Sequence, residues 1–438
     1  MNFPVWEIPV LGGGLLIGII AVVHVFISHF AVGGGLFLVL TERKARRENS
    51  AVLLDYVKRH SKFFLLLSVV AGAVTGVGIW FAIGLVHPTA TSSLIHAFVW
   101  GWAIEWVFFL VEVTSILVYV KTWDTMDART HMAVGWIYAV SSLLTLAVIN
   151  GIVAFMLTPG DWLQTRGFWD AILNPSYLPS LFSRTFIAVG FAGVYAFLTA
   201  TLLPPLPARA AIIRYSARWV LPALILLPLA LLWYNSVIPE TSREIVGGGI
   251  AAIETTARYG MYAALALLVL VVFGPLLRPK HFSFGQALVL LVLASVALFA
   301  AERVREAVRK PYILYGYMYA NGVRVEDYER VEQAGVLASS KWMSAQTIDQ
   351  ANELRLGREL FRAQCMSCHT VGGYQDIVPH LAGRTADDLD VILMDLSSFR
   401  GYMPPFAGND QERLTLARWL MTLPQPDATA RSLGGRQQ

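Results

Sequence analysis

Charged residues are scarce in this sequence: they fill 15% of its 438 positions, against about 25% in an average soluble domain. Apolar residues fill 56% of the chain, and its mean hydropathy is +0.56. These values exclude a disordered polymer and an ordinary soluble enzyme, because the chain carries too little charge and too much apolar surface for either. We therefore expect a protein that crosses a membrane several times.

Cysteine is almost missing as well. The only two cysteines lie within four positions of each other, which excludes a framework of disulfides spread along the chain. The net charge of +4 is small, and most lysines and arginines fall in short segments between apolar runs. That distribution is typical of membrane proteins and does not indicate a nucleic-acid binder.

Long apolar stretches predict the membrane spans, since a spanning helix needs about 20 apolar residues. The first stretch has neither a basic start nor a small-residue cleavage site, so we expect a retained helix rather than a signal peptide. The predicted fold class is all-α: a polytopic bundle of eight transmembrane helices with a C-terminal all-α domain. The eight stretches cover residues 10–40, 62–86, 94–121, 131–157, 184–204, 218–237, 259–277 and 283–302.

Positive charge in the connecting segments predicts the orientation of this bundle. Basic residues gather on the side that connects odd-numbered to even-numbered spans. Because Lys and Arg loops stay inside the cell, the N-terminus and everything after residue 302 are expected in the periplasm of a bacterium, with the bundle in its inner membrane. The inner side carries Arg43, Lys44, Arg46, Arg47, Lys58, Arg59, Lys62, Lys121, Arg129, Arg209, Arg214, Arg218, Arg278 and Lys280, and the outer side only Arg166, Arg184, Arg243 and Arg258.

The composition changes abruptly after residue 302, where charged residues, Tyr and Gly replace runs of Leu, Val and Ala. We predict a transmembrane domain over 1–305, a periplasmic connector over 306–350 and a compact domain over 351–424. A tail over 425–438 is rich in Pro, Gly and Gln and is predicted to be disordered.

Residues 365–369 read Cys-Met-Ser-Cys-His. Two thiols at this spacing can bond both vinyl groups of a haem, and the adjacent histidine supplies an axial nitrogen. The alternatives are a local disulfide, a redox dithiol or half of a zinc site. A redox dithiol does not require the histidine, and zinc needs more ligands than this segment supplies. The motif therefore predicts one covalent haem c on Cys365, Cys368 and His369.

The segments around this motif resemble a class I cytochrome c. A helical pattern over 354–361 precedes it, the loop Gly-Tyr-Met-Pro-Pro-Phe follows at 401–406, and an amphipathic helix over 411–423 ends the domain. The resemblance implies that Met403 of this loop is the second axial ligand. Met394 and Met421 fall in helical patterns and are interpreted as packing residues.

Four ionisable residues fall within or beside the predicted spans, where insertion of a charged group costs about 2.5–3.5 kcal/mol and so marks a candidate functional site. His24 lies midway along the first span, Glu105 and Glu112 share one face of the third, and Glu306 follows the last. Other interpretations stay open. His24 can be hydrogen-bonded across helices, the two glutamates can pair with polar partners, and Glu306 can be a solvated charge.

Five other histidines fall near loops and helix ends, where a solvated ring is ordinary. We expect no buried role for them. They are His60, His87, His96, His131 and His281.

Several short motifs, taken in order, resemble subunit I of cytochrome bd-type oxygen reductases. They are Ala-Val-Val-His at 21–24, the stretch 104–112 with its two glutamates, Lys-Thr-Trp-Asp at 121–124, His-Met at 131–132 and Glu-x-x-Arg-x-Pro-Tyr at 306–312. The resemblance covers most of residues 10–200 and the end of the last span. It implies that residues 1–305 form a bd-type haem-binding domain.

This resemblance implies roles for single residues. His24 would ligate the oxygen-binding haem and Glu306 a neighbouring high-spin haem b, with Arg309 as a propionate partner. Glu105 and Glu112 would serve the haem pocket and the supply of protons. The implied membrane cofactors are two haems b, one of which could be a haem d, since both kinds use the same protein ligands.

The sequence also departs from the family pattern. The family's third, low-spin haem b uses a helix-5 histidine, and that position holds Arg184, although Met261 matches the second ligand. Quinol-oxidising members carry a long outer loop with a lysine and a glutamate. Here residues 235–258 are short and have Glu240 and Glu244 but no lysine. The chain thus resembles a non-quinol branch in which a fused cytochrome c replaces the quinol site.

The leading functional hypothesis is a terminal oxygen reductase of the respiratory chain that receives electrons through its own cytochrome c domain. Its partners would be a periplasmic cytochrome or another one-electron donor, O2 and a possible second membrane subunit. The alternative is an electron-transfer haem subunit of a larger respiratory complex with no oxygen chemistry of its own.

Overall fold

The computed structural model of the chain describes residues 4–204 and 207–424. The predicted disordered tail, 425–438, lies outside the described residues. The chain forms two compact units. Within the described residues, the first comprises 4–20, Ile79–His96 and 309–424, and the second comprises Ala21–Gly78 and Ala97–Val308.

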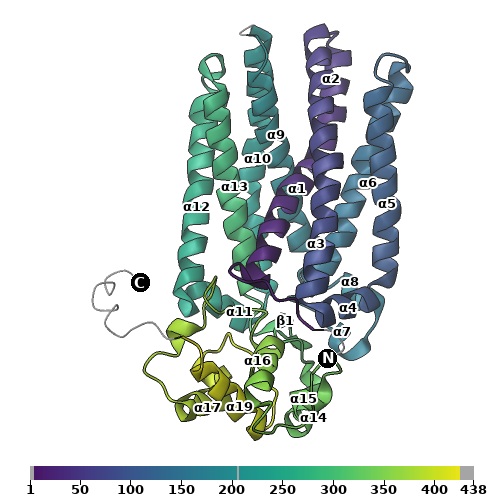
Figure 1. Cartoon of the computed structure of the whole chain (residues 1–438). Coiled ribbons are helices and arrows are strands. Elements are labelled where there is room, and N and C mark those ends of the chain that lie inside the picture. The colour runs from purple at the N-terminus through teal and green to yellow at the C-terminus, as the bar shows by residue number, and fades with distance from the viewer. Residues whose placement is uncertain (1–3, 205–206, 425–438) are drawn as a thin grey trace. The chain divides into compact units, whose positions relative to one another are not determined.

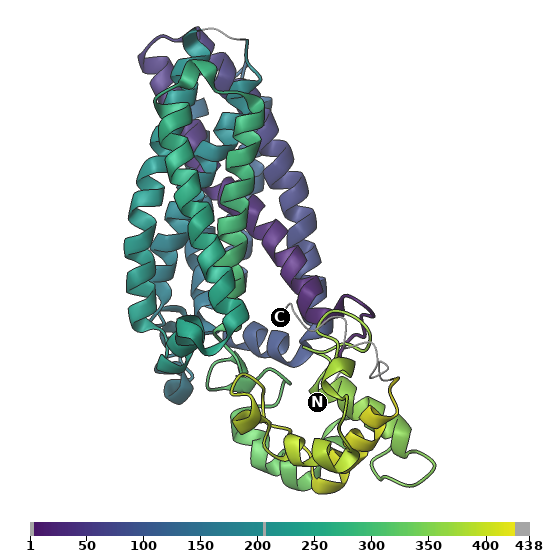
Figure 2. The ribbon, with the colours of Figure 1, turned by 90° about the vertical axis from the view of Figure 1, so that its left-hand side faces the viewer.

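Eight helices among the described residues are long and apolar enough to cross a membrane, which confirms the predicted fold class. The long helices of the second unit lie side by side as a bundle (Figure 1, Figure 2). The single-segment spans are α1 (Gly12–Arg47), α5 (Val99–Lys121), α6 (Ala128–Phe155), α9 (Tyr177–Thr201), α10 (Pro207–Val237) and α13 (Phe284–Ala307). Two spans contain π-helical turns: α2 (Ala51–Leu65), η1 (Leu66–Ala71) and α3 (Gly72–Val86) form one, and α12 (Ala251–Val271) and η3 (Val272–Leu276) form the other.

The helices extend beyond the apolar stretches at their charged ends. α1 continues to Arg47, and α2 already starts at Ala51, with the Ser50 side chain accepting a hydrogen bond from the Leu53 backbone N–H. Lys58 and Arg59, expected in a loop, are therefore helical. Hydropathy marks only the part of a helix that meets lipid, whereas Lys, Arg and Glu have good helix propensity and let the helix run on.

Short helices connect the spans. The predicted third span is broken at Phe98, so that α4 (Pro88–Ala97) precedes α5. α7 (Trp162–Thr165) and α8 (Phe168–Ile172) lie between α6 and α9, and α11 (Glu240–Glu244) and the π-turn η2 (Ile245–Gly249) precede α12. The 3-10 turn η4 (Pro279–His281) precedes α13.

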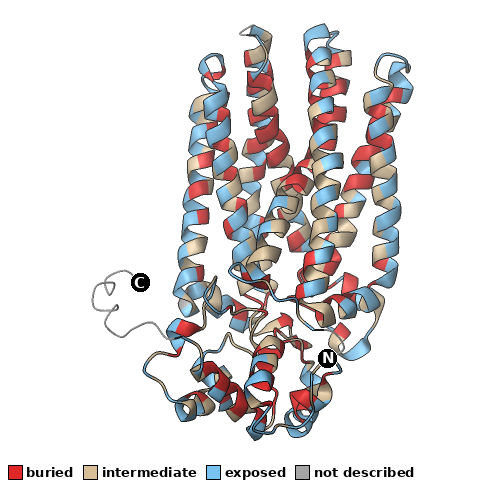
Figure 3. Ribbon diagram, viewed as in Figure 1, coloured by how far each residue is buried: buried red, intermediate tan, exposed pale blue. Residues whose placement is uncertain are grey.

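The inner faces of the bundle are apolar and aromatic. Phe30 packs against Phe64 and Tyr195 at centroid distances of 5.2 and 4.2 Å, and these three residues belong to one buried core that joins α1, α2 and α9. Many outward-facing residues are large, apolar and exposed (Figure 3). A bundle with apolar residues on both its inner and its outer faces is suited to lipid rather than to water.

The C-terminal part of the first unit is a small helical domain with its own core. α16 (Glu353–Gln364) packs on α19 (Asp410–Met421) where Gly357 leaves room for the Trp419 side chain. The connector adds a two-stranded antiparallel ribbon, and Val331 and Val336 of the connector lie in the same core. The remaining elements are β1 (Tyr312–Leu314), β2 (Met318–Tyr319), η5 (Val325–Asp327), α14 (Tyr328–Ala334), α15 (Val336–Ser339), η6 (Val378–His380), α17 (Ala386–Met394) and α18 (Leu396–Phe399).

A close helix contact inside the bundle gives a stability prediction. A Cβ atom added at Gly33 of α1 would lie 1.9 Å from the Ala188 carbonyl oxygen of α9, whereas one added at Gly18 of the same helix meets no atom within 4 Å. Gly33→Ala should therefore lower the free energy of unfolding by about 1–3 kcal/mol through overpacking. Thermal unfolding of the purified protein measures this. Gly18→Ala is the matched control, and equal melting temperatures of the two variants would contradict the prediction.

Candidate functional site

The two cysteines and the following histidine lie on a single turn after α16. The backbone N–H groups of Cys368 and His369 donate to the Cys365 carbonyl oxygen at 3.0 and 2.9 Å. Cys365 and Cys368, both within the described residues, form no disulfide. Burial raises the pKa of the Cys365 thiol to about 12, so this thiol is protonated at neutral pH, which disfavours a reactive dithiol.

The His369 ring is oriented for metal ligation. Its Nδ1 donates to the Gln375 carbonyl oxygen at 3.3 Å, and because a carbonyl only accepts, Nε2 carries the lone pair. Burial is the largest cause that lowers the pKa of His369, which favours the neutral ring that an iron ligand needs. Among the described residues no three His, Cys, Asp or Glu side chains gather into a metal site. The donors of this turn therefore fit a covalently held haem better than zinc.

The three candidate methionines differ in their surroundings. Met394 is 61% exposed, and Met421 packs against the hydrophobic core of the domain. Met403 is half-buried, and a turn in which its backbone N–H donates to the Arg400 carbonyl oxygen at 2.8 Å positions it. Met403 is accordingly retained as the proposed axial ligand.

In the second unit, His24 of α1 is held by Thr75 of α3. The Thr75 hydroxyl donates its one proton to the Ala71 carbonyl oxygen at 2.8 Å, so its oxygen accepts from His24 Nδ1 at 3.0 Å. This hydrogen bond leaves the lone pair on Nε2 of a half-buried ring. A Cβ atom at Gly76 would lie 3.2 Å from the ring, so glycine makes room for it. His24 can thus donate a hydrogen bond to another helix through Nδ1 and still offer Nε2 to a haem iron.

The two glutamates of α5 are half-buried and lie on one face of the helix, as the spacing predicted. The Glu112 carboxylate accepts a hydrogen bond from the Thr145 hydroxyl of α6. Glu112 therefore has a polar partner from the neighbouring helix and remains a candidate for moving protons.

Arg184, which the sequence resemblance matched to the position of the family's low-spin haem ligand, belongs to a half-buried ion-pair network. Its Nη2 lies 3.5 Å from Glu302 Oε1, and Glu302 also pairs with Arg305 at 2.8 Å. A guanidinium holds no lone pair for iron, so the residues at this position do not fit a low-spin haem. His29 of α1 lies nearby: its Nδ1 donates to the Val25 carbonyl oxygen at 2.8 Å, while its buried Nε2 has no hydrogen-bond partner.

The two predicted residues at the end of α13 differ in burial. Glu306 is exposed, whereas Arg309 is 3% exposed and donates from Nη1 to the Ile313 carbonyl oxygen at 2.9 Å. Glu302, not selected as a site residue from the sequence, is the carboxylate that α13 places in the ion-pair network with Arg184.

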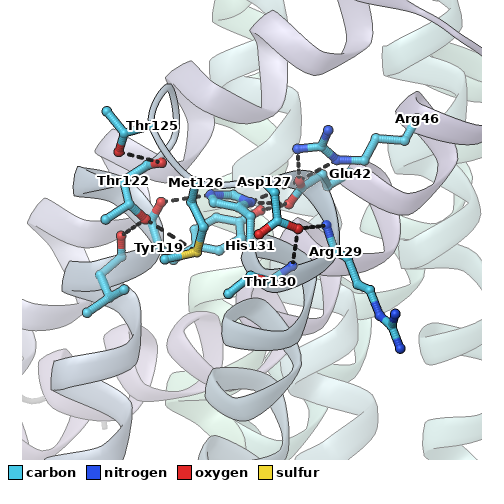
Figure 4. Close-up of polar contacts among 11 residues, drawn as sticks. Glu42, Arg46, Tyr119, Thr122, Thr125, Met126, Asp127, Arg129, Thr130 and His131 are labelled. Atoms are coloured by element: carbon cyan, nitrogen blue, oxygen red, sulfur yellow. Dashed lines mark hydrogen bonds and ion pairs between the residues drawn. The ribbon is translucent and has the colours of Figure 1, made fainter.

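Two histidines expected to be solvated are instead buried, and this corrects the sequence-based expectation. His60 and His131 are 1% and 0% exposed. His131 Nδ1 lies 2.9 Å from Glu42 Oε1, and Tyr119 and Arg46 also donate to this carboxylate (Figure 4). Sequence reasoning missed Glu42 because it adjoins the basic residues at the end of α1 and reads as part of a charged loop. The sequence signal for a buried Glu42 was its position on the apolar face of α1, had that helix been expected to continue past the apolar stretch.

Comparison with known proteins decides the family. The family model described as cytochrome bd terminal oxidase subunit I matches residues 15–235, a little more than half of the chain. The chain belongs to the cytochrome bd terminal oxidase subunit I family. A second family model, cytochrome c oxidase, cbb3-type, subunit III, matches residues 352–420. The predicted fusion of a bd-type membrane domain with a cytochrome c domain is therefore confirmed.

Among solved structures, bd oxidase from Geobacillus thermodenitrificans is similar in fold. The TM-score is 0.61 at 16% sequence identity, and the match covers 70% of this chain and 88% of that chain. No curated protein matches the sequence significantly. This bd family member is thus a multi-span haem oxidoreductase of the electron-transport type, with a haem c implied by its C-terminal domain.

The Thr75–His24 hydrogen bond gives a prediction for the bd-type site. Thr75→Val keeps the side-chain volume but removes the acceptor that fixes the His24 ring, so haem affinity should fall by about 10–100-fold. Titrating haem against the purified apoprotein, followed by absorbance, measures the change. Thr122→Val is the control, because among the described residues the Thr122 hydroxyl donates to the Val118 carbonyl oxygen and the Met126 sulfur, neither of which belongs to the proposed haem site. Equal haem affinities of the two variants would rule out the role given to Thr75.

Proposed function

We propose that this bd family member is a terminal oxygen reductase that takes electrons through its own cytochrome c domain rather than from quinol. The observation that carries the proposal is the fusion itself: a Cys-Met-Ser-Cys-His turn with an oriented His369 in a chain whose membrane part belongs to the bd family. The short segment 235–258, which has no lysine, supports the absence of a quinol site.

The residues that would hold the cofactors come from both units. Cys365 and Cys368 would form the thioether bonds to haem c, with His369 and Met403 as axial ligands. His24 would present Nε2 to the oxygen-binding haem. Glu306 would ligate the neighbouring haem, and Arg309 would neutralise a haem propionate. When bound, haem c supplies one-electron transfer and the membrane haems supply the binding and reduction of O2.

The protein's own groups handle protons and water. Reducing one O2 to two H2O takes four electrons and four protons, and a buried site must receive the two by separate routes. Glu105 and Glu112 lie on one face of α5, and Thr145 holds the Glu112 carboxylate. In the proposed mechanism Glu112 accepts protons from the cytoplasmic side and passes them toward Glu105 and the haem pocket.

The proposed topology places the N-terminus and the cytochrome c domain in the periplasm of a bacterium. The electron donor is then a periplasmic cytochrome or another one-electron carrier, and a second membrane subunit completes the assembly. The excess of basic residues on the opposite side of the bundle supports this orientation.

Oxygen uptake tests the proposed function. Purified protein with an artificial periplasmic electron donor should consume O2, and His24→Ala should reduce uptake more than 100-fold because it removes the iron ligand. Haem c reduction by the same donor should stay unchanged and serves as the internal control. A wild-type preparation with full haem content and no oxygen uptake would favour the electron-transfer subunit instead.

The network around Arg184 predicts the haem ratio. If the position of the low-spin haem is filled by the Arg184–Glu302–Arg305 ion pairs, the purified protein contains two membrane haems for each haem c. Pyridine haemochrome spectra, with haem c separated by its covalent attachment, count both kinds. Three membrane haems per haem c would show that a low-spin haem is retained.

A further inference from the structure

The segment before α1 lies against the loop that follows His369. Residues 5–12, which we call the strap, belong to the same compact unit as the cytochrome c domain. The Tyr374 backbone N–H donates to the Val10 carbonyl oxygen at 2.6 Å. A Cβ atom added at Gly373 would lie 2.5 Å from the Cα atom of Val10. The strap and this loop therefore pack backbone against backbone, at a position that only glycine permits.

Other contacts hold the strap in place. Two arginines of α16 reach it: Arg362 donates from Nε to the Val5 carbonyl oxygen at 2.8 Å, and Arg358 pairs with Glu7 at 2.9 Å. The Trp6 backbone N–H donates to a backbone carbonyl oxygen near the end of α3 at 2.9 Å. The strap is thus an ordered part of this unit, fixed by side chains of the cytochrome c domain as well as by its backbone.

The loop under the strap orients the proposed iron ligand. The Gln375 carbonyl oxygen accepts a hydrogen bond from His369 Nδ1 at 3.3 Å. The Thr370 backbone N–H donates to the same oxygen at 3.3 Å, and the Thr370 carbonyl oxygen accepts from the Ile377 N–H at 2.9 Å. Tyr374, the residue directly before Gln375, is the one that donates to the strap. The contact with the strap therefore lies one residue away from the carbonyl that orients His369.

Backbone strain is concentrated in this contact. Val10 and Gln375 have φ angles of +67° and +54°, and they are two of the four non-glycine residues with positive φ in the described ranges. This conformation costs about 1–3 kcal/mol and persists only where the surrounding contacts impose it, above all for a β-branched residue such as valine. In both residues the carbonyl oxygen accepts a hydrogen bond from the other side of the contact or from His369. Each strained residue is therefore held by its partners.

We propose that the strap is part of the haem c site and holds the loop 370–376 in the conformation in which the Gln375 carbonyl orients His369. Its residues are positioning residues, because none of them is a proposed iron ligand. The inference rests on the haem c ligands of the proposed function but not on oxygen chemistry. A carbonyl that accepts from Nδ1 makes Nε2 a more basic ligand, which favours ferric over ferrous iron. The strap therefore lowers the reduction potential of this site.

The reduction potential of haem c and the exchange of backbone amides together test the strap. Gly373→Ala places a Cβ atom against the Val10 backbone and should displace the strap. The full chain, purified with its covalent haem, is titrated with redox mediators while the haem c absorbance is recorded. The equilibrium should shift toward the reduced form by about 10-fold, which is 59 mV for one electron. Hydrogen exchange over residues 370–377, followed by mass spectrometry, should become about 10-fold faster.

Gly18→Ala is the matched control, because a Cβ atom at Gly18 meets no atom within 4 Å. It should leave the potential and the exchange rates at the wild-type values. A merely structural strap would lower the melting temperature of Gly373→Ala but leave the haem c potential of the assembled protein equal to that of Gly18→Ala. That result, or a shift toward the oxidised form, would overturn the inference.

A second variant covers the case in which Gly373→Ala does not assemble. Arg358→Gln combined with Arg362→Gln removes two contacts between α16 and the strap, and it should shift both readouts in the same directions by about 3-fold. Arg418→Gln is its control, since Arg418 pairs with Glu353 at 2.6 Å and not with the strap. Oxygen uptake is measured separately on wild type. A haem c potential that responds to the strap in a protein without oxygen uptake would support the inference and contradict the proposed function.

Discussion

A polar group inside a lipid-embedded bundle must find its hydrogen-bond partner within the protein, because no bulk water is present to solvate it. This constraint explains the polar contacts of the membrane domain. His24 is held by Thr75, Glu112 by Thr145, and Arg184 by Glu302. Each contact joins two different helices of the bundle. A side chain in the bundle therefore stays available for chemistry when its hydrogen-bond partner binds one of its polar atoms and leaves another unbound. Thr75 binds His24 in this way, through Nδ1, and leaves Nε2 available.

The same constraint separates the route for electrons from the route for protons in the proposed reaction. In the proposed function electrons enter through the cytochrome c domain, which has its own core and its own Cys-Met-Ser-Cys-His turn. Protons need a polar route through the bundle. In the proposed mechanism Glu105 and Glu112, which lie on one face of α5, provide this route, and Thr145 of α6 holds the Glu112 carboxylate.

Part of this site could be read from local sequence. The spacing in Cys-Met-Ser-Cys-His dictates the turn that brings Cys365, Cys368 and His369 together, and the structure has that turn. The eight apolar stretches predicted the eight spans, because hydropathy reports contact with lipid directly. Helix ends were predicted less well: α2 starts at Ala51 rather than at 62, since a charged helical extension looks like a loop to a hydropathy criterion.

The sequence by itself determined the membrane class, the number of spans, the covalent haem motif and the candidate residues His24, Glu105 and Glu112, because each depends on composition or on spacing along one helix. The tertiary structure alone decided which polar residues are partners. Glu42 and His131 are 89 positions apart, and both resembled solvated residues near loops until the packing of α1, α5 and α6 buried them together. The packing of α9 against α13 placed Glu302 rather than Glu306 opposite Arg184. Burial and partnership between distant helices depend on how the helices pack, and no periodicity within one helix encodes that.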